Sequence, residues 1–516
     1  MQTFEKNKKR PDNLDSSPVM ILLLLLIAFV TSLVHQFWYR RRDLPPGPMP
    51  LPIIGNMHQL YSYNRWEDKF LEWKNEYGPI YTYWLGPMPL VSVNTYSKAA
   101  DLFVKDPDAF VDRAANEHFQ GKLNGGVYGI FETTGPLWLE QRRFSLRVLR
   151  DFGLGKNKMQ ERILEEVETM LKHINSDIKM GIREHDLHMR TDIAAGSVIN
   201  SVLLGFRFTT NGNEAKFYKL KKLTSEAMEA FTDPITLIAI TSPNLSKVPP
   251  FRGAFQRSLN IMEEIHSSLE AYIEQHEEQL RDQNDDTEPR DFVDAYLLEQ
   301  RRLDKQEAKH YFLLLNLMSD FWFAGQESTS SSLTWGIAFL IQNEDVQQKV
   351  HSELDKVIGS ERFVTVEDKK ALPYLNAVLL ETLRAGNLVA QNVFHRATKD
   401  VHVDGMVIKK GMTCIPQISV FAIDPDNFKN PQQFDPSRFI DSNGELKRCD
   451  ELAPFSLGKR ACPGEGLARM ELFLFMANLL NHFKFSAAKK RPTLKKLGGG
   501  AGFATEAYKC RIEARY

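Results

Sequence analysis

The chain has 516 residues and a formal net charge of −1, with 25% charged residues of both signs. This balanced composition gives no electrostatic footprint for nucleic acid, so we expect no nucleic-acid partner. The four cysteines are Cys414, Cys449, Cys462 and Cys510, and no two of them form a CxxC pair. Their spacing fits neither a disulfide framework nor a zinc site, and their scarcity suits a reducing compartment.

The first predicted element is an apolar helix over residues 19–39, which carry no formal charge and follow a polar lead at 1–18. At a rise of 1.5 Å per residue, this helix reaches across a bilayer core of about 30 Å. A cleaved signal peptide is the alternative. The length of the segment, the lack of a small-x-small end and the arginines at 40–42 favour a retained single-pass anchor. Basic residues flank both ends, so the charge count alone leaves its orientation open.

A basic, proline-rich hinge over residues 40–54 separates the anchor from residues 55–516, which we expect to form one domain. Within that domain, residues 79–94 alternate apolar and polar residues around a Gly-Pro pair and predict a β-hairpin. Short strands and turns are expected at 393–421.

Helical periodicity dominates the middle of the chain. A mainly helical fold with a minor β region is therefore expected. The predicted helices cover residues 135–150, 157–176, 185–205, 213–231, 252–282, 291–301, 305–341, 343–357 and 374–385.

One loop near the C-terminal end of the chain combines an isolated cysteine with residues that favour tight turns. Cys462 lies among glycines and a proline in residues 455–466, directly before an apolar helix pattern. Backbone N–H groups and the positive end of that helix dipole favour a thiolate, which is a soft metal ligand. On this pattern alone, a small buried cysteine in a glycine-rich turn is the alternative.

The full pattern, Phe-x-x-Gly-x-Arg-x-Cys-x-Gly, resembles the haem-binding loop of the cytochrome P450 superfamily. Its fixed positions are Phe455, Gly458, Arg460, Cys462 and Gly464. The resemblance implies a haem b whose iron takes Cys462 as its axial thiolate, with Phe455, Arg460 and Gly464 among the cofactor-binding residues. The resemblance extends from about residue 45 to the end of the chain. It implies the P450 fold, preceded by one N-terminal transmembrane helix.

Other residues that the resemblance assigns to haem binding lie far from the cysteine loop in the sequence. Trp138 and Arg142, one helical turn apart, match the family's Trp-x-x-x-Arg helix, whose indole and guanidinium donors hold the haem propionates. A core tryptophan beside a surface arginine is the alternative. By the same resemblance Arg460, His395 and Arg113 are further propionate-binding candidates.

Glu381 and Arg384 lie three residues apart on one predicted helix, a spacing that is common on solvated helices. The resemblance pairs them with Arg438 from a later loop. Together the three are expected to form a structural triad that fixes the haem pocket.

The catalytic residues are expected midway along the 305–341 helix. Gly325 costs roughly 1 kcal/mol there relative to alanine, and the Ser and Thr residues that follow tend to bend a helix. A polar helix face is the alternative. In the family this stretch opens the helix for dioxygen, and an acid and an alcohol relay protons. The match makes Glu327 the acid and Ser328, in place of the usual threonine, the alcohol, with Thr329 as the alternative relay.

Substrate contacts are implied only through the fold. The run 235–240 is expected either to dip into the membrane beside the access channel or to form an ordinary buried loop. The segments expected to wall the pocket are 125–131, 205–245, 323–324, 389–393 and 498–503.

Six basic residues are expected to gather on the proximal side of the haem, where they would attract an acidic electron donor. Three recur along one stripe of the helix that carries Trp138, and three flank the cysteine loop. A solvated helix face is the alternative. The six residues are Arg143, Arg147, Arg150, Lys447, Arg448 and Lys459.

The resemblance is strongest to the animal microsomal branch that oxidises drugs, fatty acids and steroids, because residues 138–144 and the Asp-Phe-Gly at 151–153 match it. The expected enzyme is a haem-thiolate monooxygenase that inserts one atom of O2 into a small apolar substrate. Electrons are expected from NADPH through a diflavin reductase, with a cytochrome b-type donor as a second source. The expected location is the endoplasmic reticulum membrane, in contact with its lipid, with the catalytic domain in the cytosol.

Two other functions fit parts of the pattern. A reductase-independent haem-thiolate isomerase of peroxides needs the same cysteine loop, but such members often lack the acid–alcohol pair that Glu327 and Ser328 provide here. A non-catalytic haem-binding sensor or carrier also needs Cys462, but it explains neither the proton relay nor the basic face.

Overall fold

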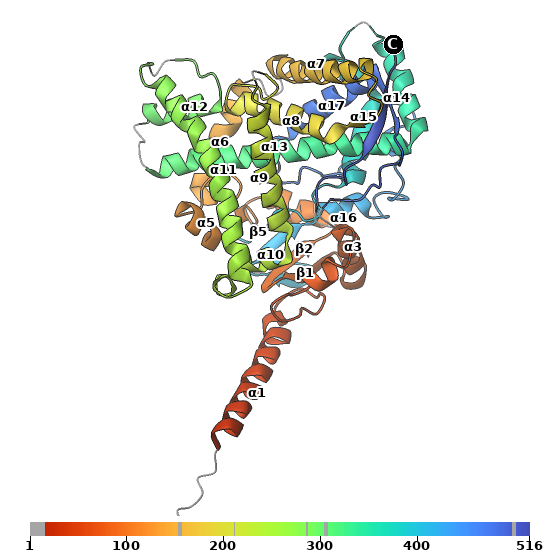
Figure 1. Ribbon diagram of the computed structural model, residues 1–516. Coiled ribbons are helices and arrows are strands. Elements are labelled where there is room, and N and C mark those ends of the chain that lie inside the picture. The colour runs from red at the N-terminus through yellow and green to blue at the C-terminus, as the bar shows by residue number, and fades with distance from the viewer. Residues whose placement is uncertain are drawn as a thin grey trace, which may run out of the picture.

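Helices form most of the body in this computed structural model, and the strands pair into small sheets (Figure 1). The mainly helical fold with a minor β region is therefore confirmed. The predicted lead at 1–18 lies mostly outside the described residues, as do Gly153 and part of the 498–503 segment. The structure describes residues 16–152, 157–210, 212–284, 287–303, 308–360, 362–497 and 502–516.

The predicted helices between residues 135 and 385 are all present, with ends that shift by a few residues. Their apolar periodicity was long enough to identify each of them. They are α6 (Gly135–Asp151), α7 (Asn157–Lys179), α8 (Leu187–Leu203), α9 (Glu214–Thr232), α11 (Phe251–Leu280), α12 (Phe292–Arg302), α13 (Ala308–Gln342), α14 (Glu344–Val357) and α15 (Pro373–Gly386). The helix after the cysteine loop is α17 (Glu465–His482).

Several shorter helices did not show in the sequence pattern. They are α2 (Met57–Leu60), α3 (Trp66–Tyr77), α4 (Tyr96–Ala99), α5 (Glu117–Asn124), α10 (Pro234–Thr241) and α16 (Ile418–Ile423). A π-helical segment occurs at Ala100–Lys105. Short 3-10 helices occur at Tyr39–Arg41, Leu245–Lys247, Val366–Ala371 and Pro436–Phe439.

The apolar run 235–240, expected as a loop, forms helix α10 instead. The Asp233 carboxylate caps this helix by accepting a hydrogen bond from the Thr236 N–H at 2.8 Å, and Pro234 occupies the first helical position. Ile238 is buried against the β1–β2 region, whereas Ile235 is exposed. One side of the run is therefore part of the core.

The predicted hairpin is confirmed as β1 (Ile80–Leu85) and β2 (Met88–Val93), which pair antiparallel. They begin a sheet of order β1-β2-β8-β5-β3, which adds β8 (Thr413–Pro416), β5 (His395–Arg396) and β3 (Asp112–Arg113). The β3–β5 register places Arg113 opposite His395. The other strands are β4 (His185–Asp186), β10 (Lys509–Ala514) and β9 (Phe483–Ala487) in one sheet, and β6 (Val401–Val403) and β7 (Met406–Ile408) in another.

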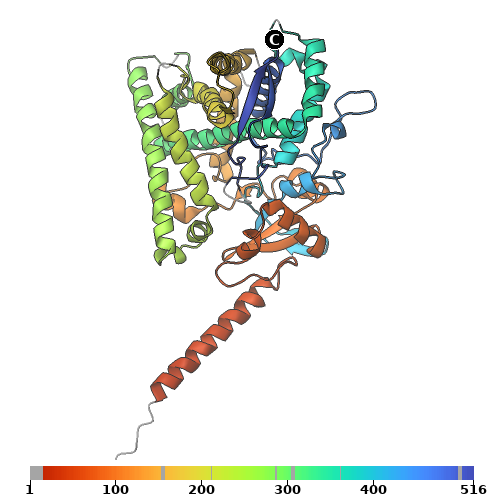
Figure 2. The same cartoon turned by 45° about the vertical axis from the view of Figure 1, so that its right-hand side comes forward.

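Helix α13 runs through the middle of the body, and α8, α15 and α17 pack against it (Figures 1 and 2). Gly325 lies where α13 and α8 approach each other. A Cβ at that position would lie 2.9 Å from Cγ1 of Ile199 on α8. Close helix packing therefore accounts for this mid-helix glycine, which sequence reasoning had taken as a sign of function.

Helix α1 (Ser16–Phe37) projects from the body at the end opposite the C-terminus (Figures 1 and 2). Every side chain from Met20 to Ala28 is exposed. Within the described ranges, no helix combines the length and the apolar character that crossing a membrane requires.

Candidate active site

The loop that carries Cys462 folds back on itself just before α17. The Cys462 N–H donates to the Phe455 carbonyl at 2.9 Å, and Gly464 is the N-cap of α17. Gly458 has a φ of +77°, and a Cβ there would lie 2.2 Å from the Phe103 carbonyl oxygen, so only glycine fits. The loop therefore holds the cysteine at the start of a helix, as its sequence pattern predicts.

The environment of the thiol differs from what the sequence led us to expect. The Cys462 side chain is solvent-accessible, yet protein atoms surround much of it. This desolvation raises the pKa of the thiol, although the Gly464 N–H and the Arg142 charge oppose the shift. The backbone N–H groups of the loop therefore act in the expected direction, but desolvation outweighs them, so the loop by itself does not favour a thiolate. A bound metal cation favours the thiolate at such a position.

Arginine side chains and one indole converge beside this loop. The guanidinium of Arg460 lies 3.9 Å from the centre of a Trp138 ring, and that of Arg142 lies 5.8 Å from it. Arg142 also donates to the Ala461 carbonyl at 2.8 Å, which ties α6 to the cysteine loop. Arg113 on β3 lies near the same cluster, and its charge contributes to the lowered pKa of Arg460.

Some donors of this cluster lack acceptors, whereas Arg460 donates to the Val111, Ile130 and Thr133 carbonyls. Nε1 of Trp138 and both Nε and Nη1 of Arg113 are buried and have no hydrogen-bond partner among the described residues. Burial lowers the pKa of Arg113 to about 9 and that of Arg460 to about 8, and repulsion between the guanidinium groups adds to both shifts. Like charges buried together are costly unless an anion pairs with them. The cluster is therefore built to bind an anion.

Ser328 lies near the middle of α13, one helical turn after the exposed Ala324. Its hydroxyl donates to the Ala324 carbonyl at 2.7 Å. Ala324 itself is exposed, so α13 borders open space at this point. The helix nevertheless continues without a break through this stretch, which differs from the expected opening. A hydroxyl that bonds back to a carbonyl one turn earlier bends a helix more readily than it interrupts it.

Glu327, the expected acid, is engaged by residues from two other helices. Its carboxylate pairs with the ammonium group of Lys221 on α9. Lys221 also contacts Asp192 of α8 at 3.2 Å. All three side chains are mostly buried. Sequence reasoning missed both Lys221 and Asp192, because nothing in the local pattern around either residue points to α13.

Thr329, the alternative relay, is buried and interacts with Glu471 of α17. Burial raises the pKa of Glu471 to about 8, and the hydrogen bond with Thr329 opposes this shift. Ser328 and Thr329 therefore differ in their partners: Ser328 bonds to the exposed Ala324 and Thr329 to a buried carboxyl group.

The cytochrome P450 family model matches residues 45–513 of the chain. The chain belongs to the cytochrome P450 family. It is 33% identical to cytochrome P450 2E1 of Oryctolagus cuniculus over 471 residues, which cover 90% of each chain.

Two further P450 relatives show the same degree of similarity. Cytochrome P450 2C38 of Mus musculus is 33% identical over 474 residues, which cover 91% of this chain and 94% of the relative. Cytochrome P450 2B4 of Oryctolagus cuniculus is 33% identical over 514 residues, which cover 96% of this chain and 99% of the relative. The similarity therefore extends over nearly the full length of both partners.

As a P450, the protein is a haem-thiolate monooxygenase whose haem iron is bound by a cysteine thiolate. It works with a redox partner, O2 and a substrate. The residues present fit the haem, because its two propionates accept from the unpartnered donors of Arg113 and add negative charge to a cluster in which Glu132 offsets the charge of Arg113 only in part. The unpartnered indole N–H of Trp138 is a further donor for them.

His395 fits a propionate less well than its sequence position suggests. Its Nδ1 lies 2.6 Å from the Phe110 carbonyl and therefore carries the proton. Burial and the nearby arginines hold the pKa of His395 well below its usual range. The neutral ring then offers an acceptor at Nε2, where a propionate needs a donor.

Glu381, Arg384 and Arg438 form a mostly buried cluster, as expected. Arg384 donates to both carboxylate oxygens of Glu381 at 2.7 Å, and Arg438 Nε lies 3.2 Å from Glu381 Oε2. Arg384 also donates to the Ala422 and Pro431 carbonyls at 2.9 Å. The cluster fastens α15 to the loop that precedes the cysteine.

Asp320 on α13 is a site residue that sequence reasoning missed. Its Oδ2 accepts hydrogen bonds from the N–H groups of Ile130 at 2.7 Å and Phe131 at 3.0 Å. Arg460 holds the Ile130 carbonyl from the other side at 3.3 Å. The predicted pocket-wall segment 125–131 is thus fastened to both α13 and the cysteine loop. A carboxylate within a mostly apolar part of α13 was the signal that could have identified Asp320.

Proposed function

We propose that Cys462 is the axial thiolate ligand of the haem iron and that Trp138, Arg113, Arg142 and Arg460 hold the propionates. The observation that carries this proposal is the cluster of three arginines beside a cysteine loop that starts a helix, in which Nε and Nη1 of Arg113 and the Trp138 indole are buried without a partner among the described residues. Bound there, the haem supplies the activation of O2.

Two further residues of the loop support that ligand position. The Phe455 carbonyl holds the cysteine N–H, and the Phe455 ring lies under the Arg469 guanidinium at 4.8 Å. Gly464 lies beside the Cys462 sulfur, since a Cβ there would be in ordinary contact with it at 3.9 Å.

We further propose that Ser328 holds a proton at its Oγ where α13 borders open space. Its hydroxyl is both donor and acceptor, so it can accept a proton from one side and deliver it to the other. Glu327 is the proposed acid behind it, with Lys221 keeping its carboxylate in place. General acid–base groups of this kind contribute about 10²- to 10⁴-fold in rate. Thr329 is the alternative, with Glu471 as its acid.

The proposed reaction inserts one oxygen atom into a small apolar substrate of the drug, fatty acid or steroid class. A reductase-independent peroxide isomerase and a non-catalytic haem carrier are the alternatives. The hydroxyl of Ser328 and the fixed carboxylate of Glu327 favour the monooxygenase, because neither alternative needs a proton relay.

The proposed electron donor is an NADPH-dependent diflavin reductase, with a cytochrome b-type protein as a second donor. Arg143 and Arg150 on α6 are exposed and support an acidic partner. Three of the six expected basic residues form ion pairs within the protein, so the basic face should attract an acidic partner less strongly than expected. The pairs are Arg147 with Glu299 at 2.9 Å, Arg448 with Asp450 at 2.6 Å and Lys459 with Asp108 at 2.6 Å.

We propose that α1 is a single-pass anchor in the endoplasmic reticulum membrane and that the catalytic body faces the cytosol. The exposed apolar side chains of α1 support this, as do Trp38 and Tyr39, residue types that favour a membrane interface. Figure 1 places α10 and β1 at the same end of the body as α1. Exposed apolar residues of this part of the chain are Leu51, Ile53, Ile235 and Val248.

A reconstituted assay tests the reaction class. The haem-loaded protein with reductase, NADPH and labelled O2 should consume NADPH and place one labelled atom in a product from a panel of steroids, fatty acids and drugs. Peroxide rearrangement without NADPH would establish the isomerase instead. Haem binding without turnover of any member of the panel would favour the non-catalytic haem carrier.

A further inference from the structure

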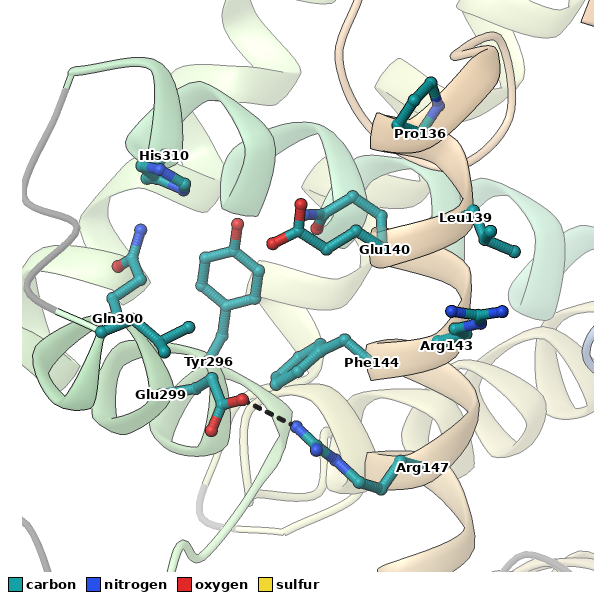
Figure 3. Close-up of a pocket in the computed structure, with 12 residues that line it drawn as sticks. Pro136, Leu139, Glu140, Arg143, Phe144, Arg147, Tyr296, Glu299, Gln300 and His310 are labelled. Carbon is teal, nitrogen blue, oxygen red and sulfur yellow. Dashed lines mark hydrogen bonds and ion pairs between the residues drawn. The ribbon is translucent and has the colours of Figure 1, made fainter.

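Two buried charges of opposite sign meet where α3 contacts the C-terminal part of the chain. Nζ of Lys496 lies 3.1 Å from Oε1 and 3.3 Å from Oε2 of Glu67, and the two side chains are only 3% and 0% exposed. By contrast, Arg147 and Glu299, which pair across one end of the cavity between α6 and α12, are 56% and 33% exposed (Figure 3). Well-packed apolar residues are often as stable as a buried ion pair. Stability alone therefore does not explain the Lys496–Glu67 pair.

Lys496 also contacts the start of an expected pocket wall. It donates to the Asn387 carbonyl at 3.0 Å, so its ammonium group has three oxygen atoms within 3.3 Å. Asn387 is the C-cap of α15, with a φ of +41°, and the chain continues from there into the wall segment 389–393. Ala390 of this segment packs in the same apolar cluster as Phe70 of α3. Lys496 thus holds the start of this wall against α3.

The backbone of Lys496 belongs to the base of a second expected wall. This is the segment 498–503, part of which lies outside the described residues. Lys496 forms a β-bridge with Thr505, and the Leu497 N–H donates to the Ala504 carbonyl at 2.8 Å. These contacts hold the two ends of the segment together. Lys496 is therefore joined to both expected walls, to one by its side chain and to the other by its backbone.

Both walls meet α13 on the face that carries Ser328. Nε1 of Trp335 donates to the Phe503 carbonyl at 3.0 Å. A Cβ at Gly386, next to Asn387, would lie 3.5 Å from Cγ of Trp335. Trp335 follows Ser328 by two helical turns, so both residues lie on the same face of α13. The spacing between the two walls therefore affects the side of α13 that carries the proposed proton relay.

We propose that Lys496 is a specificity-determining positioning residue, which sets the spacing of the pocket walls 389–393 and 498–503 through Glu67 and Asn387. A buried ammonium group needs all three oxygen atoms around it, so it fixes their relative positions more closely than an apolar side chain does. Walls that are fixed before binding increase the affinity for a ligand that fits between them. The proposal rests on the proposed function only in treating the two segments as walls of the substrate pocket.

Spectral titration of the haem-loaded, full-length protein with 1-alkylimidazoles tests this proposal. The ring nitrogen binds the haem iron and shifts the Soret band, while the alkyl chain extends between the pocket walls. Lys496→Met/Glu67→Gln removes both charges at similar size and leaves neither one buried without its partner. We expect the Kd of 1-methylimidazole to stay unchanged. The Kd of 1-dodecylimidazole should rise about 3- to 10-fold, because the walls lose their fixed spacing.

The same helix provides a matched control. Lys74 of α3 pairs with Asp424, the C-cap of α16, which lies outside both wall segments. Lys74→Met/Asp424→Asn should therefore bind both imidazoles as the wild type does. Glu67→Gln alone keeps an acceptor for Lys496, so it should raise the Kd of 1-dodecylimidazole by a smaller factor than the double variant. The CO-difference spectrum verifies the fold of each variant.

Three outcomes would overturn the proposal. The first is a wild-type Kd of 1-dodecylimidazole in Lys496→Met/Glu67→Gln, and the second is an equal rise for both imidazoles, which would place the effect at the haem. The third is loss of the CO band in Glu67→Gln and in the double variant, because the pair would then serve folding alone. The titration needs no electron transfer. A failure of the proposed monooxygenase reaction would therefore appear as absent NADPH turnover and would leave these Kd values unaffected.

Discussion

Of the four cysteines, only Cys462 combines an accessible thiol with a position at the start of a helix. Replacing Cys462 with serine should abolish the absorbance band at about 450 nm that the reduced protein gives with CO, because that band requires a thiolate ligand. The matched control is Cys449→Ser, since Cys449 is partly exposed whereas Cys414 and Cys510 are buried. A band that survives in Cys462→Ser and disappears in Cys449→Ser would show that the ligand is misassigned.

Ser328 stands where the family pattern has threonine, and it lacks the methyl group that stiffens χ1. Its hydroxyl should sample more rotamers and deliver protons less accurately. Misdelivered protons release hydrogen peroxide. We expect Ser328→Ala to raise the peroxide released per NADPH consumed, and Ser328→Thr to lower it below the wild-type ratio.

The neighbouring hydroxyl provides the comparison. Thr329 contacts the buried Glu471, so Thr329→Ala should change the peroxide-to-product ratio less than Ser328→Ala does. The reverse order would assign the relay to Thr329. Parallel measurement of peroxide and product in both variants decides between the two positions.

Predictions from sequence succeeded for residues within one short motif and failed for partners brought together by the fold. The cysteine loop was recognisable because its fixed residues lie close together in the sequence, although the contact of Gly458 with Phe103 depends on the fold. Lys221 is 106 positions away from Glu327, and no local spacing connects them. The raised pKa of the Cys462 thiol was equally out of reach, since desolvation depends on the three-dimensional neighbours.

Among helices and strands, the long periodic segments were predicted well and the short ones poorly. Helices α6 to α9 and α11 to α15 have enough turns for an apolar stripe to show. Helix α10 has 8 residues and almost no polar face, so periodicity could not distinguish it from a loop. Asp233-Pro234 was the usable signal, because an N-cap followed by proline is typical of a helix start.

The contact between α13 and α17 gives a prediction about stability and pH. Burial raises the pKa of Glu471 from its ordinary 4.5 to about 8, so the folded protein holds a proton there that the unfolded chain releases. This contribution to stability is fully present below about pH 4.5 and is lost as pH rises through about 8. Glu471→Gln cannot ionise. Its stability relative to wild type should therefore increase with pH, by at most about 5 kcal/mol.

Urea unfolding of both proteins at several pH values between 5 and 9 measures this difference. The difference should level off above about pH 8, where wild-type Glu471 is ionised in both states. Parallel pH profiles for the two proteins would mean that the Glu471 carboxyl is not buried as described.

For the whole molecule, the sequence predicted the helical body, and the long match to the P450 family agrees with it. The details of the surface were not predictable, because they depend on which charges pair across the fold. Arg147 illustrates this: it lies on the expected basic stripe of α6 but pairs with Glu299 of α12. The basic face therefore relies more on Arg143 and Arg150, which are exposed on the same helix.

The contrast between the exposed Arg143 and the paired Arg147 allows a test of the proposed electron donor. Arg143→Glu should raise the apparent KM for reductase about 3- to 10-fold at low salt, because it reverses a charge that attracts an acidic partner. The effect should shrink as ionic strength increases, since exposed charges are screened within about 10 Å at 0.1 M salt. Arg147→Gln should change the KM less, because the charge of Arg147 is already compensated by Glu299. Turnover driven by added peroxide bypasses the reductase and should be the same in all three proteins. Equal losses of reductase-driven and peroxide-driven turnover in Arg143→Glu would instead indicate damage to α6, which also carries Trp138 and Arg142.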